Sequence, residues 1–428
     1  MLQESGHLHP TFKLARQLRQ QGFDVAYFAG SELRAMVEDQ GFRVLPWFDP
    51  PEASRSGSLL RKRRAVTRAF EQMTSTLSRG EGPAKLLAEL RPALTLVDVT
   101  VPTLSFALHA AGRPFALVHT SLPQTRDPGV PPLRVLSGYR GSFVGRVKSQ
   151  LAWQRFLVRR RLSAELVRPF GLAPPYEISR RKSAAFGIAQ GQLDCATVYM
   201  PQLRDARQLV LCPQAFDFPR SPAPERYYVE SVDTERLEGD FPWQRLSPTL
   251  PLVFASLGSQ LYRGRASRRF LGRLLQVFAT RPEWQLVMSL GRHAAASDFD
   301  SCPRNAILVE RAPQLALLRR AQVMVTHGGL GSIKECILHG VPMLVVPLAV
   351  DQPGNAARVL HHGLGVSADV RRASAGQLAH QLSHLLDDES VRANLARMRR
   401  NFEHVEASGA GAQRVAEWAR ASAADHAR

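Results

Sequence analysis

Short hydrophobic runs alternate with segments of helical periodicity along most of the chain. Residues 24–30 and 94–99 are nearly continuous apolar runs, which is typical of strands buried on both faces of a parallel sheet. Residues 9–22 place Phe12 and Leu18 on one side of a helix. Because runs and helical segments alternate, the sequence predicts an α/β architecture with parallel sheets.

Two regions interrupt this alternation. The regular pattern is lost over 125–225, and 218–248 is rich in proline and has no strong periodicity. We interpret 218–248 as an interdomain linker. The sequence therefore predicts one α/β domain over 1–217, a second over 249–405, and a C-terminal helix over 406–428 that crosses back to the first domain.

A basic amphipathic helix is predicted over 145–170, where five aliphatic residues fall at helical spacing. These residues are Val147, Leu151, Val158, Leu162 and Leu166. We expect this helix to pack its aliphatic side on its own domain and to direct its arginines outward. The alternative is a helix that lies on an anionic membrane surface.

The charge of the chain favours anionic partners. Its formal net charge is +19, and arginine supplies most of it. Such a field suits nucleic acid, acidic lipid headgroups or phosphorylated small molecules, although solvated basic faces give the same composition. The four cysteines are widely spaced, which argues against a disulfide framework or a zinc site and favours a reducing cytoplasm. No apolar run approaches the roughly 20 residues of a membrane span.

The stretch "THGGLGSIKE" at 326–335 carries the clearest chemical signal. A predicted strand would deliver His327 to the carboxyl edge of a sheet, where ligands bind in doubly wound folds. Three glycines then permit a tight turn and a close approach of the backbone to a ligand. Ser332 follows where a helix begins, and free N–H groups at that point suit a phosphate. The stretch therefore predicts a cradle for a diphosphate.

The continuation of this stretch, "THGGLGSIKECILHGVPMLVVPLAVDQPGNAARV" at 326–359, resembles the donor-nucleotide signature of the UDP-glycosyltransferase superfamily. The matching positions are His327, Gly329, Ser332, Glu335, the turn 339–342, Pro347, Asp351, Gln352 and Asn355. The resemblance implies the GT-B fold, in which two Rossmann-like, doubly wound α/β domains face each other across a cleft. Less closely, 122–133, 213–220 and 254–260 resemble the zeaxanthin glucosyltransferase group within the bacterial macrolide-type branch.

The resemblance also implies roles in donor binding. His327 and Ser332, with the turn that contains Gly329 and Gly331, would hold the diphosphate, and Glu335 would accept hydrogen bonds from the ribose. A carboxylate suits paired hydroxyl groups because it only accepts hydrogen bonds.

Further matches would contact other parts of the donor. Gln314 would contact the nucleoside, Asp351 and Gln352 would bind the sugar hydroxyls, and Ser259 lies in the first loop of the nucleotide domain. Arg311 stands where plant relatives and many bacterial ones carry a tryptophan that stacks on the base. This departure leaves UDP and dTDP open as donors, with UDP favoured.

The catalytic group is expected near the N-terminus. The sequence "GHLHP" at 6–10 resembles the family's G-H-x-x-P turn, which follows the first strand and carries a histidine base. His7 is the matching histidine, and Asp98, at the end of a predicted strand, is the matching acid. A base held by a carboxylate can take the proton of an attacking hydroxyl, so the resemblance implies inverting single displacement without a metal.

The start of the chain departs from the family. Only "MLQES" precedes Gly6, where relatives have a hydrophobic strand of several residues. We expect either a stunted first strand or a true start further upstream.

Taken together, the sequence predicts an inverting glycosyltransferase that moves a hexose, most simply glucose, from a UDP-sugar to a hydroxyl of a lipophilic acceptor such as a carotenoid or polyketide. The alternatives are a weakly active or non-catalytic nucleotide-sugar-binding protein and a lipid-linked sugar transferase. No cofactor, metal or nucleic-acid partner is expected. The expected location is the cytoplasm, with peripheral contact to an anionic membrane as an option.

Overall fold

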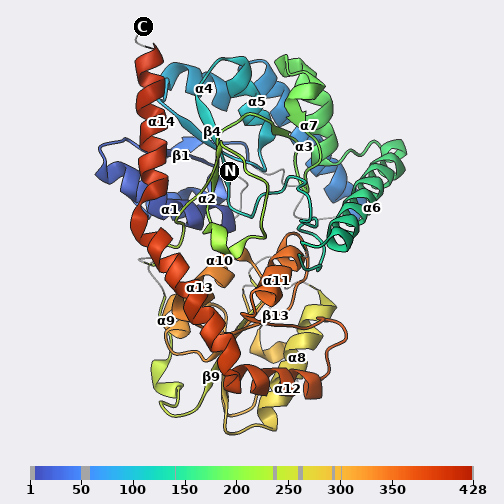
Figure 1. Cartoon of the computed structure of the whole chain (residues 1–428), viewed down its shortest axis with the longest axis vertical. Helices are drawn as coiled ribbons and strands as arrows, with labels where there is room; N and C mark the ends of the chain where they lie inside the picture. The colour runs from blue at the N-terminus through green and yellow to red at the C-terminus, as the bar shows by residue number, and fades with distance from the viewer. Residues whose placement is uncertain are drawn as a thin grey trace.

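The computed structural model describes residues 5–49, 58–139, 141–234, 239–258, 264–291, 295–299 and 301–426. Two α/β lobes are stacked along the long axis of the molecule, and the last helix of the chain runs along the flank of the N-terminal lobe (Figure 1). Both lobes contain parallel sheets, so the predicted architecture is confirmed.

The C-terminal lobe is built on one six-stranded parallel sheet. Its strands are β9 (Leu252–Ser256), β10 (Gln285–Ser289), β11 (Ala306–Val309), β12 (Val323–Thr326), β13 (Met343–Val345) and β14 (Gly365–Ser367). They are ordered β11-β10-β9-β12-β13-β14, so the chain reverses its direction across the sheet between β11 and β12. In such a sheet, ligands bind outside the carboxyl ends of the strands, next to this reversal.

Helices cover this sheet on both faces, which explains why its strands are apolar throughout. They are α8 (Arg265–Ala279), α9 (Gln314–Leu318), α10 (Leu330–His339), α11 (Gln352–His361) and α12 (Ala375–Asp387). Short 3-10 turns at Trp243–Arg245 and Ala296–Asp298 complete the lobe. Residues of β9, β10, β12 and β13 form the centre of one continuous hydrophobic core.

The N-terminal lobe contains two separate parallel sheets among its described residues. One pairs β1 (Ala26–Ala29) with β2 (Arg43–Pro46), and the other has the order β3-β4-β7-β8. The four strands of the second sheet are β3 (Thr95–Asp98), β4 (Phe115–His119), β7 (Gln208–Val210) and β8 (Arg226–Tyr228), and a small antiparallel pair joins β5 (Leu193–Asp194) to β6 (Gln202–Leu203).

The helices of this lobe begin almost at the N-terminus. They are α1 (Ser5–Gln20), α2 (Ser31–Glu38), α3 (Leu59–Ser78), α4 (Pro83–Leu90), α5 (Pro102–Ala110), α6 (Phe143–Val167) and α7 (Pro175–Lys182). Single 3-10 turns follow at Arg168–Phe170, Ser183–Phe186, Gln190–Gln192 and Gln214–Phe216.

The resemblance implied a turn at 6–10, at the start of the helix predicted over 9–22, but all of these residues are already helical. Pro10 lies inside the helix but close to its start. Pro10 is the sixth residue of α1 and lies beyond the four whose N–H groups lack a partner, so it removes one helical hydrogen bond, the one to the carbonyl of Gly6. His7 is therefore presented by the first turn of α1. Residues 1–4, the place of the expected strand, lie outside the described residues.

The predicted linker begins too early. Within 218–248, residues 226–228 form β8, which pairs in parallel with β7, and so belong to the N-terminal sheet. Three residues are too few to display a period in the sequence. The chain leaves this lobe only after β8.

The end of the chain also differs from the prediction, which placed a domain boundary at 405/406. A further helix, α13 (Glu389–Ser408), runs through that boundary, and α14 (Ala410–His426) begins after Gly409, whose φ of +62° ends α13. Helix α14 packs Val415 and Trp418 into the same cluster as Leu14 of α1. The last helix of the chain therefore packs against the N-terminal lobe.

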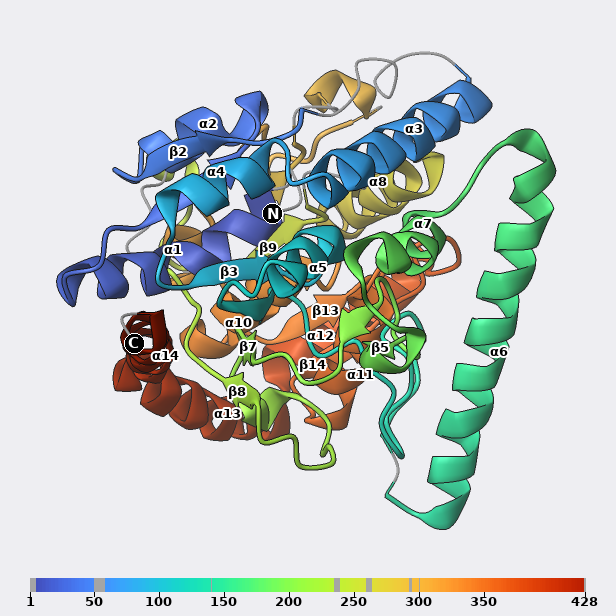
Figure 2. The same ribbon diagram turned by 90° about the horizontal axis from the view of Figure 1, so that it is seen from above.

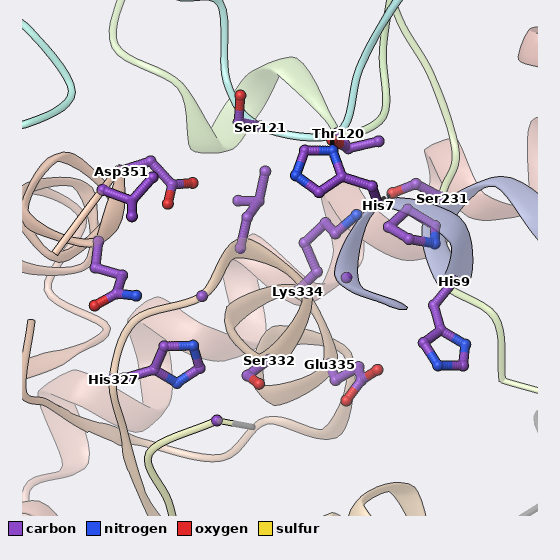
Figure 3. Close-up of a pocket in the computed structure, with 18 of the residues that line it drawn as sticks. His7, His9, Thr120, Ser121, Ser231, His327, Ser332, Lys334, Glu335 and Asp351 are labelled. Carbon is purple, nitrogen blue, oxygen red and sulfur yellow. Dashed lines mark hydrogen bonds between the residues drawn. The ribbon is translucent and has the colours of Figure 1, made fainter. Parts of the chain in front are cut away.

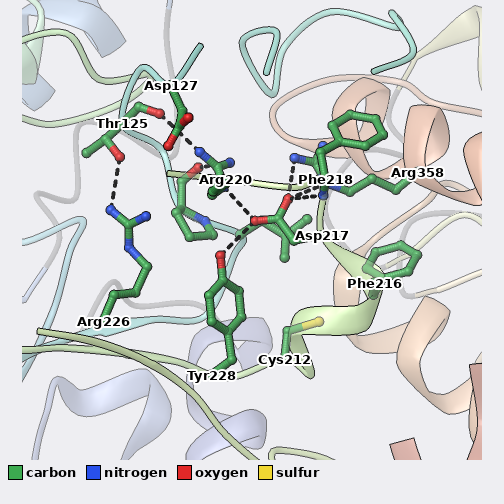
Figure 4. A network of polar contacts seen from close by, with 12 residues as sticks. Thr125, Asp127, Cys212, Phe216, Asp217, Phe218, Arg220, Arg226, Tyr228 and Arg358 are labelled. Carbon is green, nitrogen blue, oxygen red and sulfur yellow. Dashed lines mark hydrogen bonds and ion pairs between the residues drawn. The ribbon is translucent and has the colours of Figure 1, made fainter. Parts of the chain in front are cut away.

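A buried ion-pair network joins the two lobes (Figure 4). Asp217 accepts hydrogen bonds at Oδ1 from Arg358 of α11, with Nη2 at 2.6 Å and Nε at 2.8 Å. Its Oδ2 accepts from Arg220 Nε at 2.6 Å and from the hydroxyl of Tyr228 at 2.9 Å. Burial alone would raise the pKa of Asp217, but the two guanidinium groups outweigh it and hold the pKa far below its usual range.

None of the helices in the described part of the chain combines the length and the apolar character that a membrane span requires.

Candidate active site

A cleft of about 540 Å³ lies between the two lobes and takes its lining from both (Figure 3). From the N-terminal lobe come the first turn of α1 and the residues after β4. From the C-terminal lobe come the loops after β9, β12 and β13. The sequence-predicted residues in the lining are His7, Gln314, His327, Gly329, Gly331, Ser332, Glu335, Asp351 and Gln352.

On the N-terminal side, a histidine is held by a buried carboxylate. His7 Nδ1 lies 2.7 Å from Oδ2 of Asp98, the last residue of β3, and 2.8 Å from the hydroxyl of Thr120, which follows β4. The pair joins residues 91 positions apart in the sequence. An ionised carboxylate only accepts hydrogen bonds, so Nδ1 carries the proton and Nε2 is the basic nitrogen.

Asp98 is kept ionised by its neighbours. Its other oxygen, Oδ1, accepts hydrogen bonds from the backbone N–H of Thr100 at 2.8 Å and from its hydroxyl at 2.5 Å. Burial alone would raise the pKa, but the charge of His7 and the hydrogen bonds from His7 and Thr100 outweigh it. The pKa of Asp98 is lowered to about 2.

On the opposite side, the glycine turn encloses the ring of His327. A Cβ at Gly258 would lie 2.8 Å from the imidazole, and one at Gly329 would lie 2.7 Å from it. Gly328 has a φ of +87°, and a Cβ there would lie 2.7 Å from Val345. We had expected the glycines of the stretch to permit a tight turn and a close approach to a ligand. Gly328 adopts a turn conformation, whereas the room at Gly329 is taken by the ring of His327.

His327 is electrically neutral at pH 7. Burial lowers the pKa of this imidazole to about 4, because the cation would lose its hydration. The neutral ring leaves hydrogen bonding as its means of contact with a phosphate.

Three of the predicted donor residues meet at the start of α10. The amide of Gln314, the first residue of α9, donates to the hydroxyl of Ser332 at 3.2 Å and also to the carboxylate of Glu335. The side chain of Glu335 is almost completely buried and lines the cleft. A spacing of three places Ser332 and Glu335 on one face of the helix.

Asp351 and Gln352 lie where α11 begins. Gln352 Oε1 accepts from the backbone N–H groups of Leu348 and Ala349 at 2.8 and 3.0 Å, so a sugar hydroxyl would have to meet its amide nitrogen. Asp351 accepts from Asn355 at 3.1 Å. Burial raises the pKa of Asp351, although Asn355 and the facing His7 act in the opposite direction.

The structure does not bring Arg311 into the site. Arg311 is exposed on the loop before α9 and does not belong to the described lining of the cleft. Ser259 lies outside the described residues. Gly331 is at the cleft, but a Cβ there would meet open space, so the backbone geometry does not require glycine.

Comparison with known proteins identifies the family. A sequence model of the family described as "UDP-glucoronosyl and UDP-glucosyl transferase" matches residues 296–404. The chain is 27% identical over 402 residues to the zeaxanthin glucosyltransferase of Pseudescherichia vulneris, covering 91% of this chain and 89% of the relative. It is 34% identical over 215 residues to the oleandomycin glycosyltransferase of Streptomyces antibioticus, about half of each chain.

The chain belongs to the UDP-glycosyltransferase superfamily. It is accordingly a glycosyltransferase, and the predicted macrolide-type, zeaxanthin-like branch is confirmed. Solved structures confirm the GT-B fold. The glycotransferase of kitacinnamycin has a TM-score of 0.70 at 24% identity, covering 97% of this chain and 96% of that one. The spinosyn rhamnosyltransferase SpnG complexed with thymidine diphosphate has a TM-score of 0.64 at 19% identity, covering 97% and 98%.

The glycosyltransferase has cleft residues that our sequence analysis did not identify. Lys334 of α10 is fully buried, and its Nζ crosses to the N-terminal lobe, where it donates to the carbonyl of Leu211 at 2.8 Å and the hydroxyl of Ser231 at 2.6 Å. Burial lowers the pKa of this ammonium group. The sequence did contain a signal for this residue, because Lys334 is a charged residue within an otherwise apolar helical segment, and a lysine is rarely buried without a partner.

Proposed function

We propose that this glycosyltransferase moves a hexose from a UDP-sugar to a hydroxyl of a lipophilic acceptor, with inversion at the anomeric carbon. The observation that carries the proposal is the pair His7–Asp98, at 2.7 Å, in the same cleft as the residues that begin α10. A base on one side and an anion-binding helix end on the other suit a reaction in which a hydroxyl attacks and a diphosphate departs.

His7 is the proposed general base. Asp98 fixes the tautomer with the proton on Nδ1, so Nε2 accepts the proton of the acceptor hydroxyl as its oxygen attacks the anomeric carbon. The imidazolium that forms is stabilised by the buried, ionised carboxylate. Because the oxygen attacks opposite the leaving group in one displacement, the configuration inverts.

The start of α10 is the proposed site of the diphosphate. The first N–H groups of a helix lack partners within it, and the positive end of its dipole favours an anion. His327 and Ser332 add hydrogen bonds, so the negative charge on the leaving diphosphate is met without invoking a metal ion. Glu335 and Gln314, joined to each other, are proposed to bind the ribose and the nucleoside.

The acceptor is proposed to enter from the N-terminal side of the cleft. Tyr199 and Met200 line it there, together with the carbon atoms of Val350, and they suit an apolar molecule with a hydroxyl. Relatives named for zeaxanthin and for oleandomycin support a carotenoid or polyketide acceptor.

Incubation with UDP-glucose and a panel of hydroxylated lipophiles, followed by product mass, tests this function. The expected product is heavier than the acceptor by one hexose, and its anomeric proton coupling in NMR reports the configuration. The variant His7→Ala should lose turnover and still bind UDP in calorimetry. If the wild type binds UDP but transfers no sugar to the panel or to water, the protein is a nucleotide-sugar binder instead. Parallel runs with dTDP-glucose identify the base.

A further inference from the structure

Helix α6 lies at the outer edge of the molecule, beside the N-terminal lobe (Figure 2). It contains 25 residues, which corresponds to a rod of about 37 Å. Only Gly145, Ser149 and Trp153 among its residues are buried. The aliphatic positions that we had expected to pack on the domain are therefore not the ones that do so.

The inward side of α6 is fixed by polar contacts. Trp153 Nε1 donates to the carbonyl of Val130 at 2.8 Å. The guanidinium group of Arg160 donates to the carbonyls of Thr197 at 2.7 Å and Cys195 at 2.9 Å. It also lies over the ring of Tyr176, 3.7 Å from the centroid. An arginine thus points inward, contrary to our expectation for this helix.

The outward side of α6 carries an aliphatic row along its whole length. We call it the α6 row, and it consists of Val144, Val147, Leu151, Val158, Leu162 and Leu166. These side chains are between 42% and 72% exposed. At 100° per residue they fall on the side of the helix opposite Trp153. The spacings along the row are three, four, seven, four and four residues over about six helical turns, a helical periodicity that a scatter of single exposed side chains does not produce.

Cations flank the α6 row. The helix contains six arginines and lysines and one glutamate, and Glu165 is itself paired with Arg168 at 3.3 Å. Lys148, Arg159 and Arg161 are exposed beside the row, and Arg155 is exposed within it, in the gap between Leu151 and Val158.

A second basic segment adjoins the C-terminal end of the helix. It is the run 61–64 of α3, where Arg64 Nε donates to the carbonyl of Phe170 at 3.4 Å. The row and its flanks therefore combine aliphatic side chains with a dense positive field.

We propose that the α6 row is a docking surface for an anionic lipid bilayer. The valine and leucine side chains enter the boundary between headgroups and acyl chains, and the guanidinium groups reach the lipid phosphates. Arginine suits this position because its methylene stem lies along apolar surface while its charge stays among the headgroups.

Charge complementarity favours a bilayer over a second copy of this chain. Two α6 rows placed face to face would bring their cations together, and like charges across an interface oppose association. The overall charge of +19 acts in the same direction, since it attracts an anionic surface and repels another copy.

The position of α6 connects the proposed docking surface to the cleft. Arg160 holds the backbone at 195–197, and Tyr199 and Met200 of the same segment line the cleft. A bilayer under α6 would therefore lie beside the entry proposed for a lipophilic acceptor. The docking itself does not depend on the identity of the acceptor or on turnover.

Sedimentation with lipid vesicles tests the proposal. The full chain is mixed with vesicles of phosphatidylcholine alone and with vesicles of equal parts phosphatidylcholine and phosphatidylglycerol. We expect binding to the anionic vesicles only, and release at about 1 M salt, where the screening length falls to about 3 Å.

Matched variants separate the two components of the surface. Leu151→Gln/Leu162→Gln should weaken vesicle binding at least about tenfold, because two half-exposed leucines no longer enter the lipid. Arg155→Gln/Arg159→Gln should weaken it about fivefold per cation removed. Glutamine keeps a helix intact, and circular dichroism checks this. Leu90→Gln, at a leucine of α4 with 42% exposure, is the control and should leave binding unchanged.

Four results would overturn the proposal. They are no sedimentation with anionic vesicles, equal sedimentation with neutral ones, an effect of Leu90→Gln as large as that of the α6 pair, and a wild-type dimer in analytical ultracentrifugation that Leu151→Gln/Leu162→Gln converts to monomers. The last result would assign the row to a contact between copies. Transfer to a water-soluble acceptor, measured in parallel, stays at the wild-type level in the α6 variants and so separates this proposal from the proposed function.

Discussion

Replacing Asp98 by asparagine is the sharpest test of the proposed base. In the wild type, Oδ1 accepts from Thr100 and Oδ2 accepts from His7 Nδ1. The asparagine oxygen is expected to keep the two donors of Thr100, which places its NH₂ group against His7. Because that group only donates, His7 Nδ1 must become the acceptor and the ring proton moves to Nε2. The nitrogen that faces the acceptor hydroxyl then has no lone pair to receive a proton.

The structure also supplies a magnitude for this substitution. Its surroundings lower the pKa of Asp98 from 3.8 to about 2, which corresponds to about 2.5 kcal/mol of net stabilisation of the charge. If the imidazolium in the transition state loses a comparable amount, the rate falls by roughly 60-fold. The wrong tautomer adds to this loss, so we expect kcat to fall by about 10³-fold to 10⁴-fold.

The assay is initial-rate UDP release with a saturating acceptor, together with calorimetric UDP affinity, which should stay unchanged because Asp98 lies on the other side of the cleft. Asp127→Asn is the matched control. Asp127 is also a buried aspartate of the N-terminal lobe and hydrogen bonds to Ser221, so kcat should change little. The reasoning is refuted if Asp98→Asn keeps more than about a tenth of the wild-type kcat while UDP binding is intact.

Three further substitutions test the donor turn and the lobe interface. Gly329→Ala places a Cβ 2.7 Å from the ring of His327, so the ring must shift, and UDP affinity in calorimetry should fall; Gly331→Ala, which faces open space, is the control. Glu335→Gln should weaken UDP binding by about 1.5–3 kcal/mol, the value of a hydrogen bond to a charged group, and should leave the melting temperature nearly unchanged. Arg358→Met should lower the free energy of unfolding by about 3 kcal/mol in urea titrations, because it removes one of the two cations that compensate the buried Asp217 and leaves only Arg220, whereas the exposed Arg399→Met should not. Since the pKa of the paired aspartate is depressed, its stabilisation is complete above its unfolded pKa and is lost as the pH falls, so the difference between wild type and Arg358→Met should shrink below about pH 4.

The relative placement of the residues proposed to bind the donor could be predicted from the sequence because its geometry is local. A strand, three glycines and a helix start within ten residues determine where His327, Ser332 and Glu335 lie relative to one another. A spacing of three in a helix puts Ser332 and Glu335 on one face whatever the rest of the chain does. The parallel sheets followed for a similar reason, since apolar runs that alternate with amphipathic segments have few other ways to bury themselves.

Contacts between distant residues could only be matched by resemblance. Nothing in the residues around His7 or Asp98 specifies that they meet across 91 positions; the ends of β3 and β4 and the first turn of α1 bring them together. The strand β8 was missed because three residues show no period, and it exists through its pairing with β7. The burial of the Lys334 ammonium group is likewise explained only by the two oxygen atoms of the other lobe that accept its hydrogen bonds.

Helix α6 shows most clearly what the sequence determined and what the tertiary structure determined. Its spacing determined that the valines and leucines share one side, because a helix turns by a constant angle per residue. Which side faces the protein was decided by the neighbours, since Val130, Thr197 and Cys195 offer carbonyl oxygens that Trp153 and Arg160 satisfy and that a leucine would leave unpaired. The sequence therefore determined which residues of α6 share one side of the helix, whereas only the tertiary packing determined whether that side is covered.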